Sequence, residues 1–363
     1  MWQPDYQCKV SWKESLLFTK HFTMMENMKR KCIAKEETNV GYIQRTWCLF
    51  LMVFTLSMLT CLSACGGENE QPESGPQRGF DIETAAFKCR DPFIYWHEQT
   101  KRYYLHVNGG GKISCYTSSD LQWWRYECDS FVPRYNFWGK EDFWAPDLYE
   151  YKDRYYLFVT FSAPDAKRGT SILVADHPAG PFEPLVNGPI TPKDQMCLDG
   201  SLYIDEQGTP WMLYCREWLE AVDGEIYAVQ LTDDLKARKG DPQLLFRASA
   251  APWVGDITAQ GVTGKVTDAP FVMRDEQTGR LYMTWSSFRR SNGAYAIGVA
   301  YSEGDITGPW KHKSTQIVSG GGHAMLFKTK AGRMMISYHA PNTSPSYLTL
   351  RKAYFYQNEL LIE

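Results

Sequence analysis

The chain has 363 residues, of which 44% are hydrophobic and 22% are charged, and its formal net charge is −3 at pH 7. This composition is typical of a globular protein with enough apolar residues for one large domain or two ordinary ones. The small negative charge gives no electrostatic reason to expect nucleic-acid binding.

Residues 1–65 are predicted to be an N-terminal extension and a lipoprotein signal peptide. Basic residues, including Lys29 and Arg45, precede the apolar run TWCLFLMVFTLSMLTCLSAC, which ends at Cys65. A basic segment, an apolar segment and small residues before a cleavage point are the three parts of a secretory signal. The Leu-Ser-Ala-Cys ending resembles a bacterial lipobox, in which the cysteine is acylated. We therefore expect a lipid anchor on Cys65 and a location in the bacterial cell envelope; a transmembrane anchor is the alternative.

Residues 66–80 are polar and rich in Gly and Pro, which predicts a flexible tether before a folded domain at 81–363. Five cysteines lie in that domain, an odd number without any Cys-x-x-Cys spacing. Neither a full disulfide framework nor a zinc site is therefore indicated. We expect most of them to be small core residues, with one disulfide possible. They are Cys89, Cys115, Cys128, Cys197 and Cys215.

Five segments of the domain share one plan. Each has a special polar or small residue, an apolar strand, a polar turn and a second strand rich in aromatic residues. The segments are RDPFIYWHEQTKRYYLHV, WAPDLYEYKDRYYLFVTF, LDGSLYIDEQGTPWMLYC, TDAPFVMRDEQTGRLYMTW and GGHAMLFKTKAGRMMISYH. Short runs of β-branched and aromatic residues between turn residues indicate β-strands, and the domain has no long amphipathic helix. Aligned on the first strand, the equivalent positions are Asp91, Ala145, Asp199, Asp268 and His323.

These repeats predict an all-β fold, a five-bladed β-propeller. A meander of about 55 residues cannot bury a core alone, but five of them packed around an axis can. The innermost strand of each blade then begins near the axis, so the five equivalent positions converge on one face of the central channel. Four of the five are ionisable, which makes this cluster the candidate functional site.

Carboxylates that are crowded in a partly desolvated funnel repel one another, and their pKa values separate. One group can then stay ionised while another stays protonated, as acid–base cleavage of a glycosidic bond requires. An inverting enzyme uses a carboxylate to activate water and a carboxylic acid to protonate the leaving oxygen, roughly 6.5–9.5 Å apart. Opposite sides of a propeller axis provide about that distance.

The five motifs together resemble glycoside hydrolase family 43 over essentially the whole mature chain. The resemblance implies a five-bladed propeller enzyme that cleaves α-L-arabinofuranosyl or β-D-xylosyl linkages, with arabinose- or xylose-containing oligosaccharides or polysaccharides as partners. Asp91, in the Arg-Asp-Pro motif, matches the family's general base. Asp199, in Leu-Asp-Gly, matches the auxiliary aspartate that raises the pKa of the acid and orients it.

The general acid is where this sequence departs from the family pattern. The family usually has a glutamate before Gly-Pro or Ala-Pro at the start of blade four, where this chain has Asp268. An aspartate is one methylene shorter, and a displacement near 1 Å can lower a rate by a large factor. The second candidate is Glu217, in YCREW, because the second strand of blade three returns to the face where Asp199 begins. Reach favours Glu217, with Asp268 then positioning the substrate.

Three further residues complete the expected site. His323, in Gly-Gly-His, matches a histidine that many family members direct towards a channel calcium ion or its waters. One histidine is a poor calcium site, so a hydrogen bond over the active site is an equal alternative. Arg90 should neighbour Asp91 and help to keep it ionised. Trp144, with Trp138 and Phe143 nearby, is the candidate for a sugar-stacking wall, and blade packing is the alternative.

Two other functions fit parts of the pattern. A non-catalytic, glycan-binding surface lipoprotein would keep the propeller but lack the acid. A retaining five-bladed enzyme of the fructan-cleaving type also has an Arg-Asp-Pro motif, but the mature chain has no Trp-x-Asn-Asp-Pro-type start. The anomeric configuration of the first product separates this second alternative from inversion.

Overall fold

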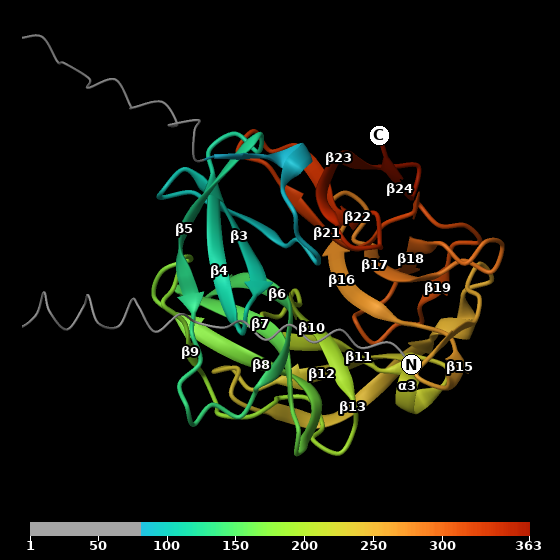
Figure 1. Cartoon of the computed structure of the whole chain (residues 1–363). Helices are drawn as coiled ribbons and strands as arrows, with labels where there is room; N and C mark the ends of the chain where they lie inside the picture. The colour runs from blue at the N-terminus through green and yellow to red at the C-terminus, as the bar shows by residue number, and fades with distance from the viewer. Residues whose placement is uncertain (1–80) are drawn as a thin grey trace, which may run out of the picture. The chain divides into compact units, whose positions relative to one another are not determined.

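The computed structural model describes residues 81–363, which form five antiparallel β-sheets around a central axis. Figure 1 shows the innermost strands β6, β10, β16 and β21 grouped at the centre of the ring, with the later strands of each sheet further out. The prediction of an all-β, five-bladed propeller is confirmed. The predicted signal peptide, the lipidated Cys65 and the tether lie outside the described residues.

The first three blades follow the chain in order. Blade one contains β2 (Ile94–His97), β3 (Arg102–Gly109), β4 (Lys112–Ser118) and β5 (Trp123–Phe131), and β1 (Ile82–Glu83) pairs with β5 at its outer edge. Blade two contains β6 (Glu141–Tyr151), β7 (Arg154–Ala163), β8 (Ala166–Ala175) and β9 (Glu183–Pro184). Blade three contains β10 (Cys197–Ile204), β11 (Pro210–Arg216), β12 (Glu225–Leu231) and β13 (Arg238–Arg247).

The last two blades carry the C-terminal third of the chain. Blade four contains β16 (Asp268–Arg274), β17 (Leu281–Phe288) and β18 (Tyr295–Ser302), with β19 (Lys311–His312) and β20 (Val318–Ser319) both paired to β18. Blade five contains β21 (Gly322–Lys328), β22 (Met334–Ala340), β23 (Tyr347–Tyr356) and β24 (Glu359–Ile362). Between blades three and four lies the hairpin of β14 (Ile257–Ala259) and β15 (Val262–Gly264). The described helices are short: η1 (Thr84–Ala86), α3 (Trp218–Ala221) and η2 (Ala248–Ala250).

The hydrophobic core lies between neighbouring blades rather than within one. Phe158 of blade two and Met212 of blade three are fully buried in the same cluster, and Trp285 of blade four is buried with Ile226 of blade three. Strands such as β7 are buried on both faces because a blade is covered on each side. This arrangement explains why a single repeat is not a stable unit.

The two ends of the described chain meet and close the ring. The backbone nitrogen of Leu348, in β23, donates to the carbonyl of Phe87, and the nitrogen of Cys89 donates to the carbonyl of Ser346. The segment that leads into blade one is therefore fixed to blade five. This pairing protects a sheet edge that an open ring would leave exposed.

One residue at the start of each innermost strand has a positive φ angle: 53° at Asp91, 48° at Ala145, 55° at Asp199, 51° at Ala269 and 58° at His323. The predicted alignment is wrong by one residue in blade four, because Ala269 and not Asp268 occupies the equivalent position. A β-bulge is present at this point in blades two to five. A bulge leaves two residues opposite one, so consecutive side chains such as Leu198 and Asp199 both reach the cavity.

The five cysteines of the described region are free thiols, and all but Cys128 are buried, as expected of core residues. Within residues 81–363, no helix has the length and apolar character that a membrane span needs.

Candidate active site

A cavity of about 300 Å³ opens where the innermost strands begin. Its wall brings together every residue that the sequence placed in the catalytic or substrate-binding site. These residues are Arg90, Asp91, Trp144, Asp199, Glu217, Asp268 and His323. The lining also includes Asn108, Leu198, Trp218, Ile257, Val266, Phe288 and Tyr295. Five blades therefore build one site from residues that are far apart in the sequence.

Asp91 stands between two histidines. Its Oδ1 lies 3.1 Å from Nδ1 of His323 and 3.3 Å from Nδ1 of His339. Burial raises the pKa of the Asp91 carboxyl, but the charges and hydrogen bonds of the two histidines hold that pKa well below its usual range. Asp91 is therefore a carboxylate at neutral pH, as a group that removes a proton from water must be.

His323 is the positive charge at the centre of this cluster. Burial alone would lower its pKa, but Asp91 and Asp199 raise it to about 10. Its Nδ1 also lies 3.8 Å from Oδ2 of Asp199. A protonated imidazole here offsets part of the negative charge that the carboxylates concentrate in the cavity.

Asp199 is fixed by backbone hydrogen bonds. Its own backbone nitrogen donates to Oγ1 of Thr160 at 2.9 Å, and its Oδ2 accepts from the backbone nitrogen of Ala269 at 2.9 Å. Burial raises the pKa of Asp199 to about 7, against the influence of His323 and with a contribution from Asp268. Its rigid position next to the other carboxyls fits the role of an orienting and pKa-raising group.

Glu217 lies directly after β11 and before helix α3, and it is buried. The antiparallel return of β11 brings it back to the face of Asp199, as predicted. One oxygen, Oε2, accepts a short hydrogen bond from Nη1 of Arg168. Burial raises the pKa of Glu217 above its usual value, Arg168 lowers it, and Asp199 raises it again.

Asp268 is held by a tyrosine. The hydroxyl of Tyr295 donates to Oδ2 of Asp268 at 2.8 Å. Burial raises the pKa of Asp268 to about 6, although the Tyr295 hydrogen bond and His323 oppose the shift and Glu217 favours it. Glu217 and Asp268 thus both face the cavity with raised pKa values. The geometry is compatible with either one as the general acid and the other as the residue that positions the substrate.

Several residues of the site were not found from the sequence. His339 and Tyr295 come from second and third strands, outside the first-strand positions that the repeat alignment compares. The predicted site also does not include Asp147, which borders a small space in the channel with Asp199 and His323 and whose pKa burial raises to about 8. Its place in the Trp-Ala-Pro-Asp motif, two residues after the positive-φ position of blade two, was an available signal.

Two expectations about neighbours are corrected. Arg90 lines the cavity, but its guanidinium donates to Asn342 and Ser346. The two histidines, rather than Arg90, account for the low pKa of Asp91.

The second expectation concerns the aromatic residues near the cavity. Phe143 packs edge-to-face on Phe161, with 4.9 Å between the ring centroids, so it is a core residue. Trp138 donates to Oγ of Ser171 and packs on the same core. Of the three aromatic candidates, Trp144 is the one that faces the cavity, with 38% of its surface exposed.

The residues around His323 do not fit a calcium ion held directly by the protein. Calcium takes six to eight oxygen ligands. Among residues 81–363, no group of three or more His, Cys, Asp or Glu side chains is arranged to hold a metal. Nδ1 of His323 faces Asp91 and Asp199. Binding of a calcium ion through water molecules stays a prediction, and the proposed catalytic step involves no metal ion.

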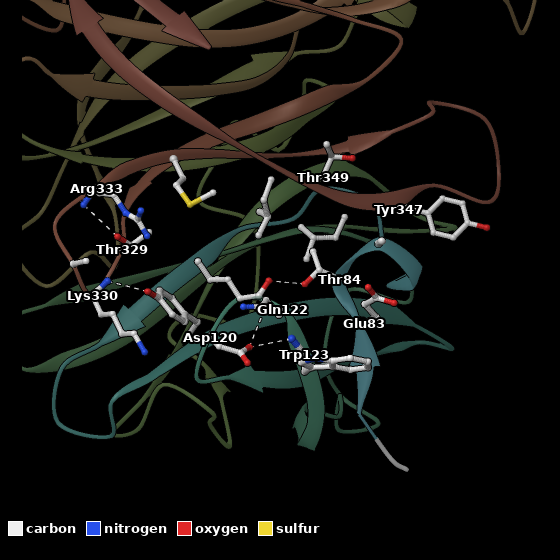
Figure 2. Close-up of a pocket in the computed structure, with 17 residues that line it drawn as sticks. Glu83, Thr84, Asp120, Gln122, Trp123, Thr329, Lys330, Arg333, Tyr347 and Thr349 are labelled. Atoms are coloured by element: carbon white, nitrogen blue, oxygen red, sulfur yellow. Dashed lines mark hydrogen bonds between the residues drawn. The ribbon is translucent and has the colours of Figure 1, made fainter. Parts of the chain in front are cut away.

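A larger hollow of about 790 Å³ lies between blades one and five, away from these carboxyls (Figure 2). Its acidic residues, Glu83 and Asp120, are exposed. Oδ1 of Asp120 accepts from the backbone nitrogens of Gln122 and Trp123, so it stabilises a local turn. We therefore place the chemistry in the smaller cavity, where buried carboxyls meet.

Gly322 is required by the close approach of Tyr295. A Cβ atom at position 322 would lie 1.9 Å from Cε1 of the Tyr295 ring. We expect Gly322→Ala to destabilise the protein by about 1–3 kcal/mol, as overpacking does. It should also lower activity, because the displaced ring holds Asp268 and stacks on His339. Urea denaturation and initial rates test this, with Gly109→Ala, which meets nothing within 4 Å, as the control. Equal stability of the two variants would contradict the prediction.

Comparisons with known proteins agree with this geometry. The family model described as glycosyl hydrolases family 43 matches residues 84–362. A crystal structure of an endo-arabinase from Bacteroides thetaiotaomicron VPI-5482 is 55% identical, with a TM-score of 0.76, over 77% of this chain and 99% of that one. An extracellular exo-α-(1→5)-L-arabinofuranosidase, ArbA, from Cellvibrio japonicus (strain Ueda107) is 26% identical over 246 residues, 62% of this chain and 67% of the relative.

A structure titled endo-1,4-beta-xylanase, also from Bacteroides thetaiotaomicron VPI-5482, is 24% identical with a TM-score of 0.62, over 76% of this chain and 94% of that one. At this identity it shows a shared fold. The family match covers the entire described propeller apart from its first three residues and its last one, and it includes each carboxyl of the cavity. This chain belongs to glycosyl hydrolases family 43.

Proposed function

We propose that this glycoside hydrolase cleaves α-L-arabinofuranosyl linkages of arabinan or its oligosaccharides by single-step inversion. The observation that carries the proposal is the cluster of buried carboxyls around one cavity, with Asp91 held ionised and Glu217 raised in pKa. The similarity to an endo-arabinase at 55% identity supports arabinose over xylose. β-D-Xylosyl linkages remain the second candidate, supported by the family's substrates.

The proposed step uses the side chains as follows. Asp91 accepts a proton from a water molecule, whose oxygen forms a bond to the anomeric carbon. The glycosidic carbon–oxygen bond breaks at the same time, and Glu217 gives its proton to the leaving oxygen. Asp199 raises the pKa of Glu217 by its charge. Asp268, with Tyr295, would position the sugar, and Trp144 and Arg90 would contact it.

Hydrolysis assays on the soluble domain, residues 66–363, test this proposal. We expect release of reducing sugar from linear arabinan, and faster turnover of an aryl α-L-arabinofuranoside than of an aryl β-D-xyloside. ¹H NMR should show the inverted anomer first. Binding of arabinan without release of sugar would instead favour the non-catalytic alternative, and a retained anomer would contradict inversion.

We also propose that the protein acts at the bacterial cell surface through a lipid on Cys65. The Leu-Ser-Ala-Cys ending supports this, as does the extracellular location named for the Cellvibrio japonicus relative. Labelling of growing cells with an alkyne fatty acid tests it. The full-length chain should be labelled and Cys65→Ser should not.

A further inference from the structure

Arg168, near the start of β8, contacts Glu217 and Trp144, which line the cavity, and Asp142, which does not. Its Nη1 donates to Oε2 of Glu217. Its Nε and Nη2 lie 3.0 and 2.9 Å from Oδ2 of Asp142. Its Cζ lies 4.2 Å from the centroid of the Trp144 ring. With 12% of its side chain exposed, Arg168 is largely desolvated, so each of these contacts is sheltered from water.

The charges of this group do not balance one to one. Two carboxyls, Asp142 and Glu217, share a single guanidinium. Asp142 is also held by Oγ of Ser162, which donates to the same Oδ2 at 2.7 Å. Because Asp142 already neutralises Arg168, Glu217 is the surplus carboxyl. It can take up a proton without leaving an unpaired buried cation behind.

We propose that Asp142 and Arg168 form a charge-balanced pair that positions Glu217 as the proton donor and Trp144 as the sugar platform. This inference rests on the proposed function, because it takes Glu217 as the general acid. Asp142 and Arg168 lie outside the repeated motifs. They act as positioning residues and not as catalytic residues, because they do not touch the reacting atoms.

The contacts determine which atoms remain for the substrate. Oε2 of Glu217 accepts from Arg168, which has only donors, so a proton on Glu217 must sit on Oε1. One face of the Trp144 indole is covered by the guanidinium, in the geometry of a cation–π contact. Trp144 is 38% exposed, and the covered face leaves the opposite face of the indole for a sugar to stack on. A single arginine thus orients the proton and the stacking surface together.

The charges around Glu217 predict opposite effects for the two partners. Burial raises the pKa of Glu217, Arg168 lowers it, and Asp199 and Asp142 raise it. Removing Arg168 should therefore raise that pKa, whereas removing the charge of Asp142 should lower it. The charged groups that face Glu217 from neighbouring elements are Asp142 on β6, Arg168 on β8, Asp199 on β10 and Asp268 on β16.

The pH dependence of kcat/KM on an arabino-oligosaccharide tests the inference. An acid catalyst must be protonated, so its pKa sets the basic limb of the profile. Asp142→Asn should move the basic limb to lower pH, and Arg168→Gln should move it to higher pH. Arg168→Gln should also lower kcat by about 10²-fold, the effect of a misplacement near 1 Å. Arg168→Lys, which keeps the charge without the planar fork, should lower kcat and leave the limb near the wild-type position.

A matched control removes a second arginine–aspartate pair from the same blade. Nε of Arg154 lies 2.9 Å from Oδ1 of Asp176 at the surface, and Arg154→Gln should leave the profile unchanged. Titration of the Glu217 carboxyl by ¹³C NMR, assigned with Glu217→Gln, should show the same opposite shifts without any turnover. Asp142→Asn is nearly isosteric, so it decides the question if Arg168→Gln does not fold.

The inference would be overturned if Asp142→Asn and Arg168→Gln both left the basic limb of the kcat/KM profile in place and also left the pKa of Glu217, measured by NMR, unchanged. Hydrolysis by the wild-type protein would then still support the proposed function. Shifts of both variants in the same direction would overturn it as well. The inference requires opposite shifts, whereas a general disturbance of the structure would be expected to move both profiles in the same way.

Discussion

Asp91→Asn should lower kcat on arabinan by about 10²–10⁴-fold, the contribution of a positioned general base. An amide cannot accept the proton that water must lose, so the loss should appear in kcat more than in KM. The protein should still fold, because asparagine has nearly the same shape and Asp91 lies in a site formed by five blades rather than in a hydrophobic cluster. Initial rates, thermal denaturation and binding of an arabino-oligosaccharide by calorimetry measure these three effects.

The control for this variant is Asp176→Asn, an exposed aspartate of blade two that should retain wild-type rates. Some loss of stability is expected in Asp91→Asn but not in the control. Asp91 has a pKa below its unfolded value, so it contributes stability at pH values above that unfolded value. Turnover close to wild type in Asp91→Asn would remove Asp91 from the mechanism.

Glu217→Gln and Asp268→Asn should separate the two candidate acids. The variant that lacks the acid should lose about 10²–10⁴-fold in kcat on arabinan, whose leaving oxygen needs a proton. The same variant should keep most of its rate on an aryl arabinofuranoside with an acidic leaving group. We expect this pattern for Glu217→Gln, because the carboxyl of Glu217 borders the cavity and its pKa is raised by burial and, to a smaller extent, by Asp199.

For Asp268→Asn we expect losses of similar size on both substrates, since a positioning group acts whatever the leaving group is. The reverse pattern, in which Asp268→Asn alone is rescued by the activated substrate, would assign the acid to Asp268 and make Glu217 the positioning residue. The raised pKa of Asp268, about 6, gives that outcome a physical basis.

The sequence by itself determined the architecture and most of the site. Strand-forming runs separated by turns recur five times, and repeats that cannot bury a core alone must pack around an axis. The special residue at the start of each repeat marked Asp91, Asp199 and His323, because each innermost strand begins at the channel. Glu217 was found from the rule that the second strand of an antiparallel pair returns to the same face. All of these are local patterns or direct consequences of the topology.

Only the tertiary structure decided which groups are in contact. The same bulge recurs in blades two to five, and in blade four it puts Ala269 in the repeated position and Asp268 in the one before it. The partners of the key groups lie on other strands: His339 beside Asp91, Tyr295 beside Asp268, and Arg168 beside Glu217. The Tyr295 contact joins the first and third strands of blade four, and the other two join different blades. Such contacts depend on how strands and blades pack side by side, and no single stretch of sequence contains that information.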